Sequence, residues 1–381
     1  MAKTSERLSE FRGGERILAA NPGLYDALGV IDDMKCSDLG TVLMFHAETK
    51  AEQTNCREII DGNQFNKPST VSLRDFHFLE GIIMDSLSDT EFVDVSPLQP
   101  FGTSSKIAGT SQKTIMPALR RSEVNSDATT SLFREAYTRY KKGSDNSEVH
   151  IATNTRVTRL QVFDPKSGFL PHFRMFAQVT VGGGENRGPQ ELEALVSHLA
   201  SEVAILDRVA KSERGDIKDL SIKIGNLVLT EDLIDRGLVD RSVVRRHTQD
   251  PDYNLLKAAG FEVPSIVLID SDEFNDVMKE IGFNKGSVVI DHFKDAIEKQ
   301  APQLLTRIAL DLGRVAGVGY YRHLCYKINA TNNNGLTLPL VDGGTTEWAK
   351  TIDPRDKLVY TVTSGIGTEL LAKHFITQSR Q

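Results

Sequence analysis

Two strand-like runs joined by a short turn constrain the fold of this chain more than any other feature. The runs cover residues 156–163 and 173–181, and the segment 164–168 between them reads Asp-Pro-Lys-Ser-Gly, which is typical of a turn. Three glycines at 182–184 end the second run. A hairpin of this kind predicts antiparallel pairing, so we expect the core to be built on an antiparallel sheet.

Helical and strand-like patterns alternate on both sides of this hairpin. Ser72 is suited to cap an amphipathic helix over 72–88, which leads into a short strand at 91–95. Further helices are predicted at 129–141, at 189–213 and near the C-terminus from Gly367, and further strands at 41–46, 220–224, 265–269, 319–328, 336–341 and 358–363. This order predicts an α+β fold, with an antiparallel sheet of about six strands flanked by helices and an inserted α/β module.

The same patterns divide the chain into four expected regions. Residues 1–66 are an N-terminal extension, because turn-like residues at 61–64 and 66–68 indicate a boundary. The core is expected over 67–187 and again over 303–381. The inserted module is expected to occupy the interval 188–302 between the two core segments.

Charge and cysteine content exclude several classes of protein. The 381 residues include 45 Lys and Arg against 52 Asp and Glu, a net charge of −7 that does not suit a general polyanion binder. Cys36, Cys56 and Cys325 lie far apart, and neither they nor the histidines have metal-ligand spacing, so we predict no disulfide framework and no metal site. Without a signal sequence or a long apolar stretch, the chain is expected to be soluble, cytoplasmic and independent of membranes.

Four collinear segments carry a family resemblance. They are the helix and strand over 72–95 followed by Pro97; the run Ser126-Asp-Ala-Thr-Thr-Ser-Leu-Phe-Arg134; the hairpin with Thr158-Arg-Leu-Gln161 and Pro171-His-Phe-Arg-Met-Phe176; and a C-terminal block with Gly317-Val-Gly-Tyr-Tyr321, Asp342-Gly-Gly344 and Gly365-Ile-Gly-Thr-Glu-Leu-Leu371. Together they resemble the catalytic core of class II aminoacyl-tRNA synthetases. The most similar branch is histidyl-tRNA synthetase with its paralog, the regulatory subunit of ATP phosphoribosyltransferase.

The resemblance assigns the amino-acid side of a candidate site. Asp127 and Thr129 match the acid and threonine that contact the substrate ammonium in that family, and Arg134 matches its substrate-binding arginine. A carboxylate beside a hydroxyl suits a primary ammonium, because it supplies opposite charge and directional acceptors. Asp127 or Thr129 capping the helix that ends at 141 is an equally good interpretation. Tyr320 and Tyr321 match the paired tyrosines of the histidyl signature.

The hairpin and the last motif supply the nucleotide side by the same resemblance. Arg159 would clamp a phosphate and the substrate carboxylate, Phe173 would stack on adenine, and Gln161 stands where the family has an acid. A surface hairpin with solvated arginines and core phenylalanines is the alternative. Glycines at a helix N-terminus can approach a nucleotide closely, and the acid of the last motif would contact metal or ribose; these residues are Gly365, Gly367 and Glu369. The resemblance thus implies ATP and Mg²⁺.

Several positions depart from the family pattern. In the histidyl signature, Ala316 stands in place of the arginine and Gly319 in place of the aspartate. Thr345 stands where the Gly-Gly-Arg strand of the family has its arginine, and Leu370 stands where the last motif has its phosphate-clamping arginine. Removing such a charge-assisted contact typically costs a few kcal/mol of transition-state stabilisation. The sequence also ends about ten residues after the last motif, which leaves no room for the anticodon-binding domain of the histidyl enzyme. We therefore predict against tRNA binding.

Two functions remain open at this point. One is an adenylate-forming ligase that activates a small amino or carboxylic acid, with Arg159 and Glu369 as catalytic residues, for an acceptor other than tRNA. The other is an inactive regulatory or sensing paralog, similar to the phosphoribosyltransferase subunit and able to act on a protein partner. In both cases the resemblance implies a two-fold homodimer.

Overall fold

The computed structural model describes residues 14–53, 63–109, 122–143, 147–164, 169–248, 250, 252–283 and 285–379, which fall into two compact units. The smaller unit contains residues 14–53, 63 and 122–123, and the larger unit contains the other described residues. The helices of the smaller unit are α2 (Gly14–Ala20), α3 (Leu24–Asp33) and α4 (Cys36–Gln53).

The strand predicted at 41–46 is wrong, because these residues lie inside α4. A six-residue apolar run does not by itself distinguish a strand from a helix. The hydroxyl of Thr41 donates to the carbonyl of Ser37, and that of Thr49 donates to the carbonyl of Phe45, each one helical turn back. The residues that follow the run, Ala47-Glu-Thr-Lys-Ala-Glu-Gln53, are mostly good helix formers.

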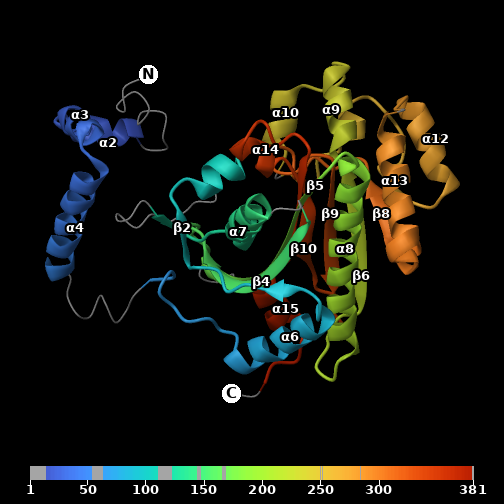
Figure 1. The fold of residues 1–381 in the computed structure, drawn as a ribbon, viewed down its shortest axis with the longest axis horizontal. Coiled ribbons are helices and arrows are strands. Elements are labelled where there is room, and N and C mark those ends of the chain that lie inside the picture. The colour runs from blue at the N-terminus through green and yellow to red at the C-terminus, as the bar shows by residue number, and fades with distance from the viewer. Residues whose placement is uncertain are drawn as a thin grey trace. The chain divides into compact units, whose positions relative to one another are not determined.

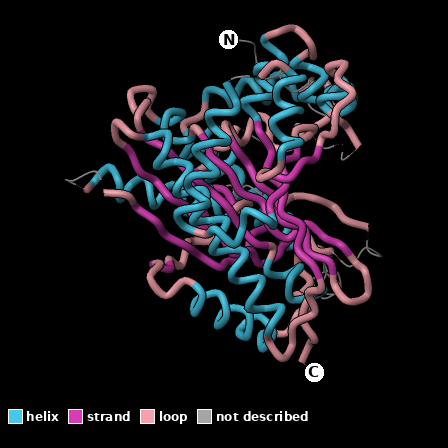
Figure 2. The backbone as a smooth tube through the Cα atoms, turned by 90° about the vertical axis from the view of Figure 1, so that its right-hand side faces the viewer, coloured by secondary structure: helices cyan, strands magenta, loops and turns pink. Residues whose placement is uncertain are grey.

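The larger unit contains one extended sheet with helices on both faces (Figures 1 and 2). Its helices are α6 (Leu73–Ser86), α7 (Ala128–Lys142), α8 (Arg187–Lys211), α9 (Leu227–Asp235), α10 (Arg241–Arg246), α11 (Leu255–Ala258), α12 (Asp272–Ile281), α13 (Lys285–Gln300), α14 (Trp348–Ile352) and α15 (Thr368–His374), with a π-helix η1 (Thr103–Ile107) and a 3₁₀-helix η3 (Pro302–Arg307). Its strands, together with β3 at the unit boundary, are β1 (Glu91–Phe92), β2 (Leu98–Pro100), β3 (Ser122–Val124), β4 (Val149–Thr158), β5 (His172–Gly183), β6 (Asp219–Asn226), β7 (Ile266–Leu268), β8 (Ile308–Asp311), β9 (Leu324–Thr331), β10 (Thr337–Thr346) and β11 (Val359–Ile366).

The sheet confirms the predicted α+β class and is mostly antiparallel. Among the described residues it has nine strands, in the order β1-β4-β5-β11-β10-β9-β6-β8-β7, so the expectation of about six was too low. Only the β1–β4 and β6–β8 pairs are parallel. Ser72 caps α6 as predicted, by accepting a hydrogen bond from the backbone N–H of Asp75.

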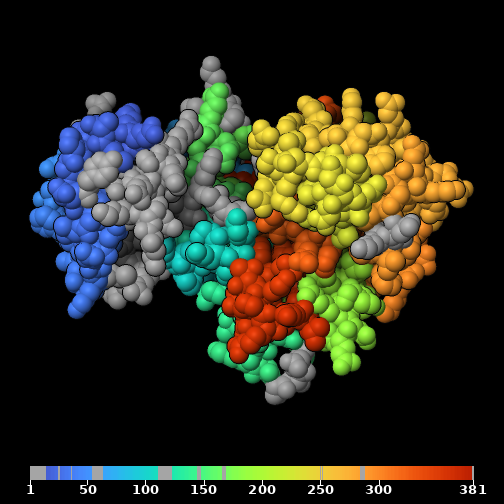
Figure 3. All heavy atoms as spheres, turned by 90° about the horizontal axis from the view of Figure 1, so that it is seen from above, coloured from blue at the N-terminus to red at the C-terminus, as the bar shows by residue number. Residues whose placement is uncertain are grey.

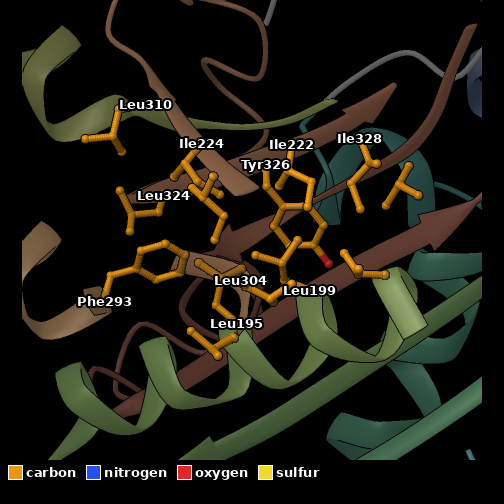
Figure 4. Packing of buried hydrophobic residues seen from close by; sticks show 14 of the residues in the cluster. Leu195, Leu199, Ile222, Ile224, Phe293, Leu304, Leu310, Leu324, Tyr326 and Ile328 are labelled. Atoms are coloured by element: carbon orange, nitrogen blue, oxygen red, sulfur yellow. The ribbon is translucent and has the colours of Figure 1, made fainter. Parts of the chain in front are cut away.

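Two helices cover opposite faces of the central strands, because alternate residues of a strand point to opposite sides. On one face α7 packs against odd-numbered residues that include Ile151, Ala177 and Val179. On the other face α8 packs against Phe176 and its neighbours. Figure 4 shows this second core, where residues of α8 meet those of β6 and β9; its labelled residues are Leu195, Leu199, Ile222, Ile224, Phe293, Leu304, Leu310, Leu324, Tyr326 and Ile328.

The interval 188–302 contributes to this same sheet. Strand β6 pairs antiparallel with β9, from Asp219 opposite Thr331 to Asn226 opposite Leu324, and β7 extends the sheet beyond β8. In the space-filling view of Figure 3, the yellow and orange residues of α9 to α13 form one continuous surface. The interval therefore shares the core of the unit rather than forming a core of its own.

The predicted hairpin exists, but its first strand begins earlier than expected. Strand β4 pairs with β5 from Val149 opposite Val181 to Thr158 opposite His172, so residues 159–163 lie beyond the strand. There the backbone N–H of Phe163 donates to the side chain of Gln64 instead of to a neighbouring strand. Strand β1 is likewise limited to Glu91–Phe92 of the predicted 91–95.

Candidate ligand-binding site

Arg159 and Phe173 lie together where the hairpin leaves the sheet. The backbone N–H of Arg159 donates to the carbonyl of Pro171 at 2.8 Å, which fixes the residue directly after β4. Its guanidinium carbon is 5.2 Å from the centroid of the Phe173 ring, and its Nε donates to the carbonyl of Ser126 at 3.0 Å. One third of the side chain stays exposed.

Asp127 caps α7 and at the same time faces this arginine. Its Oδ1 accepts hydrogen bonds from the backbone N–H and the hydroxyl of Thr129, at 3.0 and 2.7 Å. Its Oδ2 lies 3.8 Å from Nη2 of Arg159. The helix-cap interpretation is therefore correct, and the second carboxylate oxygen of Asp127 lies near the guanidinium of Arg159. A carboxylate next to an arginine can receive the ammonium and the carboxylate of one ligand.

Tyr320 connects this pair to the C-terminal block. Its hydroxyl lies 3.1 Å from the hydroxyl of Thr129, and its ring meets the rings of Tyr321 and Trp348 edge to face. Burial, with the carboxylate of Asp127 nearby, raises the pKa of Tyr320 well above its usual range, and burial does the same for Tyr321. Both hydroxyls therefore stay protonated at neutral pH and can donate hydrogen bonds.

A cavity of about 680 Å³ has Tyr320 and Tyr321 in its wall, while Asp127, Thr129 and Arg159 do not line it. Its other walls come from η1, from the start of α9 and from α14, and they include Lys106, Leu227, Arg322, His323, Glu347 and Trp348. A cavity of this size is within the range of small-molecule sites. Tyr320 and Tyr321 thus border a space that can admit a ligand.

Glu369 is held by internal partners. Its Oε2 accepts from Nη1 of Arg156 at 3.1 Å and from the backbone N–H of Arg174 at 2.9 Å, and its Oε1 accepts from the hydroxyl of Ser69 at 2.6 Å. Nη1 of Arg156 also lies 2.9 Å from Nδ1 of His172. The opposite ring nitrogen, Nε2, donates to the carbonyl of Lys67 at 2.7 Å. The segment before α6 is thereby joined to the hairpin and to α15.

A second, smaller pocket lies beside this network. It measures about 210 Å³ and its walls are mainly apolar; they include Phe163, Phe169, Leu170, Phe173, Gly367, Glu369, Leu370 and Lys373. Leu370 places an alkyl side chain where the resemblance expects an arginine. Glu369 is already paired, and the described residues contain no group of three His, Cys, Asp or Glu side chains that could hold a metal ion. As arranged, both carboxylate oxygens of Glu369 are engaged by protein groups.

The remaining predicted site residues lie apart from the Asp127–Arg159 pair or have other roles. Arg134 is exposed, nearly two turns farther along α7. Gln161 lies beyond β4, where its backbone N–H donates to the carbonyl of Arg159. A Cβ on Gly365 would lie 2.6 Å from the carbonyl oxygen of Phe176, so this glycine allows β11 to approach β5. At Gly367 the nearest atom to an added Cβ is a Leu370 side-chain carbon at 3.4 Å.

Asp342 and Arg314 were not among the predicted site residues. Nη2 of Arg314 donates to Oδ1 of Asp342 at 3.2 Å, and the Arg314 side chain is almost entirely buried. Asp342 belongs to the Asp-Gly-Gly motif. The absence of a side chain at Gly343 leaves space for the ring of Tyr326, and its absence at Gly344 leaves space for the ring of Tyr321. The Asp-Gly-Gly motif was the sequence signal that could have identified Asp342. The strand register, which no local pattern reveals, is what places the Asp342 carboxylate near the tyrosines.

The architecture of the larger unit is a class II aminoacyl-tRNA synthetase-like fold. No protein-family model matches the chain, and no curated protein sequence matches it. Solved structures do match, and they confirm the resemblance at the level of the fold. Among the described residues, no helix is long and apolar enough to cross a membrane.

Three of the similar structures are close in fold and distant in sequence. The first is described as an ATP phosphoribosyltransferase regulatory subunit/histidyl-tRNA synthetase from Bacillus halodurans C, with 15% identity and a TM-score of 0.58 over 82% of this chain and 83% of that one. Histidyl-tRNA synthetase from Nostoc sp. PCC 7120 has 14% identity and a TM-score of 0.59 over 83% and 76%. The apo S. aureus histidyl-tRNA synthetase has 14% identity and a TM-score of 0.53 over 80% and 72%.

Proposed function

We propose that this chain binds a free α-amino acid and acts as a regulatory or sensing paralog on the class II synthetase fold. The carboxylate of Asp127 and the hydroxyl of Thr129 receive the ligand's ammonium, and the guanidinium of Arg159 receives its carboxylate. Tyr320 orients Thr129 through the hydrogen bond between their hydroxyls. In its amino-acid-bound state the chain regulates a protein partner. The chain and this partner are both cytoplasmic.

The observation that carries this proposal is the internal pairing of Glu369. Its two carboxylate oxygens accept three hydrogen bonds, from Arg156, the backbone of Arg174 and Ser69, where a catalytic core would keep the acid for nucleotide or metal. Leu370 adds to the argument, because an alkyl side chain stands where the resemblance expects a phosphate-clamping arginine. One similar solved structure is described as an ATP phosphoribosyltransferase regulatory subunit/histidyl-tRNA synthetase, a description that includes the regulatory class.

Calorimetric titration with the twenty amino acids, in the absence of nucleotide, tests the proposal. We expect at least one amino acid to bind, and Asp127→Asn to weaken its binding by about tenfold or more, because the negative charge that pairs with the ligand's ammonium is lost. Asp270→Asn serves as the matched control, since Asp270 is an exposed surface acid paired with Lys294. If no amino acid binds to the folded chain, the proposal is wrong.

The guanidinium of Arg159, whose central carbon lies 5.2 Å from the centroid of the Phe173 ring, favours a second candidate, an adenylate-forming ligase. In that reaction a carboxylate oxygen of the substrate attacks the α-phosphorus of ATP and pyrophosphate leaves, before the acyl group passes to an acceptor other than tRNA. Arg159 would neutralise the phosphate charge. ATP and Mg²⁺ belong to this candidate alone. It requires amino-acid-stimulated release of pyrophosphate, which the regulatory paralog does not produce.

A further inference from the structure

The cavity of about 680 Å³ is not used by the proposed amino-acid contacts. None of Asp127, Thr129 and Arg159 lines it, whereas residues of η1, α9 and α14 do. Its volume is within the range of sites that bury most of a small molecule. The cavity is therefore a second place where this chain can hold a ligand, and the residues of its wall indicate the chemistry of that ligand.

Aromatic and aliphatic residues make up one part of the wall. Trp348 and Tyr320 meet edge to face with ring centroids 5.4 Å apart, and Tyr320 meets Tyr321 in the same way at 4.8 Å. Leu227 and Val228, at the start of α9, add aliphatic side chains. A flat ring gains apolar burial and favourable ring contacts against such residues. This part of the wall suits a ligand with an aromatic body.

The two acids in the wall, Glu231 and Glu347, are already paired with cations of the chain. Glu231 accepts from both Nη atoms of Arg241, at 3.0 Å on Oε1 and 2.6 Å on Oε2. Glu347 pairs with Arg322 through Oε2, and its Oε1 accepts from Nζ of Lys350 at 3.1 Å. Because these carboxylates are matched by positive charge, they do not favour a cationic ligand.

Lys106 is a cation of the wall whose charge is not matched in this way. It lies on η1, is exposed, and forms no ion pair with any residue in the described part of the chain. His323, also in the wall, is engaged, since its Nδ1 donates to Oε2 of the buried Glu191 at 3.0 Å. An ammonium at the border of a partly apolar cavity favours a ligand that carries one anionic group.

We propose that this cavity is a second ligand site and that it binds an aromatic carboxylate of one or two rings. The rings pack against Trp348 and Tyr320, and the ammonium of Lys106 donates to the carboxylate. Tyr320 also contacts Thr129 through its hydroxyl, so the ligand touches a residue that borders the amino-acid contacts without occupying them. The inference goes beyond the proposed amino-acid binding and does not depend on it.

The fluorescence of Trp348 tests the proposal, because it is the only tryptophan of the chain and it lines the cavity. The probes are 4-nitrobenzoate and 4-nitrobenzamide, which share a quenching nitroaryl ring and differ in charge. We expect saturable quenching by both, with 4-nitrobenzoate binding about fivefold or more tightly, and Lys106→Gln to reduce this preference to about twofold or less. The amide should bind Lys106→Gln as it binds wild type, which also shows that the variant is folded. Lys299→Gln, at an exposed lysine on α13, is the matched control and should keep the full preference.

Three results would overturn the inference. They are the absence of saturable quenching by 4-nitrobenzoate, equal binding of the two probes to wild type, and a preference for the acid that persists in Lys106→Gln. Amino-acid binding is measured separately by calorimetry, where Lys106→Gln should behave as wild type does. Failure of the second site therefore leaves the proposed function intact, and failure of amino-acid binding leaves the second site intact.

Discussion

Glu202, on α8, is a fully buried acid on the face of the sheet opposite the candidate site. Its Oε2 accepts a hydrogen bond from the hydroxyl of Tyr326 at 2.6 Å, while its Oε1 has no hydrogen-bond partner among the described residues. Burial dominates and raises the pKa of Glu202 to about 8, although the hydrogen bond from Tyr326 opposes that shift. The folded chain therefore holds this carboxyl protonated at neutral pH.

Replacing Glu202 by glutamine should change how stability depends on pH. The pKa of Glu202 is raised on folding, from 4.5 to about 8, so the wild type loses stability as pH rises through this window and no further above it. Glutamine resembles the protonated acid and does not titrate. We expect chemical denaturation to show a stability difference in favour of Glu202→Gln that grows by about 1.4 kcal/mol per pH unit within the window. A difference that is constant from pH 5 to pH 9 would contradict this account.

Some site residues could be predicted from the sequence because their roles are local. Asp127 and Thr129 sit at the start of a recognisable helix, and Arg159 follows a recognisable hairpin strand. Asp342 could not be predicted in this way, because its neighbours come from strands that are distant in sequence. The internal pairing of Glu369 depends on Ser69, three hundred residues away, and was equally inaccessible.

At the scale of elements, the pairing of β5 with β11 depends on a glycine. A Cβ at Gly365 would meet the backbone oxygen of Phe176, which cannot move without moving the strand. We expect Gly365→Ala to lower the free energy of unfolding by about 1–3 kcal/mol, the usual cost of overpacking. Gly367→Ala is the matched control, because its nearest neighbour is a flexible side chain. Equal stability of the two variants in chemical denaturation would show that the close approach does not matter.

Element boundaries were harder to predict than the elements themselves. The helices predicted at 129–141 and 189–213 exist with ends shifted by one or two residues, because a long amphipathic pattern identifies a helix well. The first hairpin strand begins at Val149 instead of 156, since mixed polar residues such as His150 and Asn154 obscured its alternation. Its side-chain contacts come from α6, β5 and α15, which no local pattern reveals.

At the scale of the whole molecule, the resemblance predicts a two-fold dimer. Leu73 and Met84 of α6 are large apolar side chains that are 76% and 48% exposed in the single chain, as expected of an interface. Sedimentation at micromolar concentration should give twice the mass of the chain, and the double variant Leu73→Glu/Met84→Glu should give the mass of one. Val288→Glu, at an exposed position on α13, is the control. A wild type that sediments as a single chain would contradict the prediction.

The α+β class and the antiparallel core were predictable from the whole chain, while the extent of the sheet was not. The interval 188–302 reads as an independent α/β pattern, yet β6 pairs along its full length with β9, about a hundred residues later. Strand pairing over such a separation is decided by the hydrophobic core on the α8 face, where Ile222 and Ile224 meet Leu195 and Leu199. A single sequence carries no local record of that contact.

Pyrophosphate release is the measurement that tests the central claim most directly. Wild-type chain is incubated with ATP, Mg²⁺ and each amino acid that calorimetry shows to bind, with Arg159→Ala as the control for contaminating activity. If the chain binds an amino acid but cannot use ATP, the amino acid binds and the release of pyrophosphate stays at the level of the Arg159→Ala control. Release that is stimulated by the bound amino acid and abolished in Arg159→Ala would contradict the regulatory function and establish the ligase.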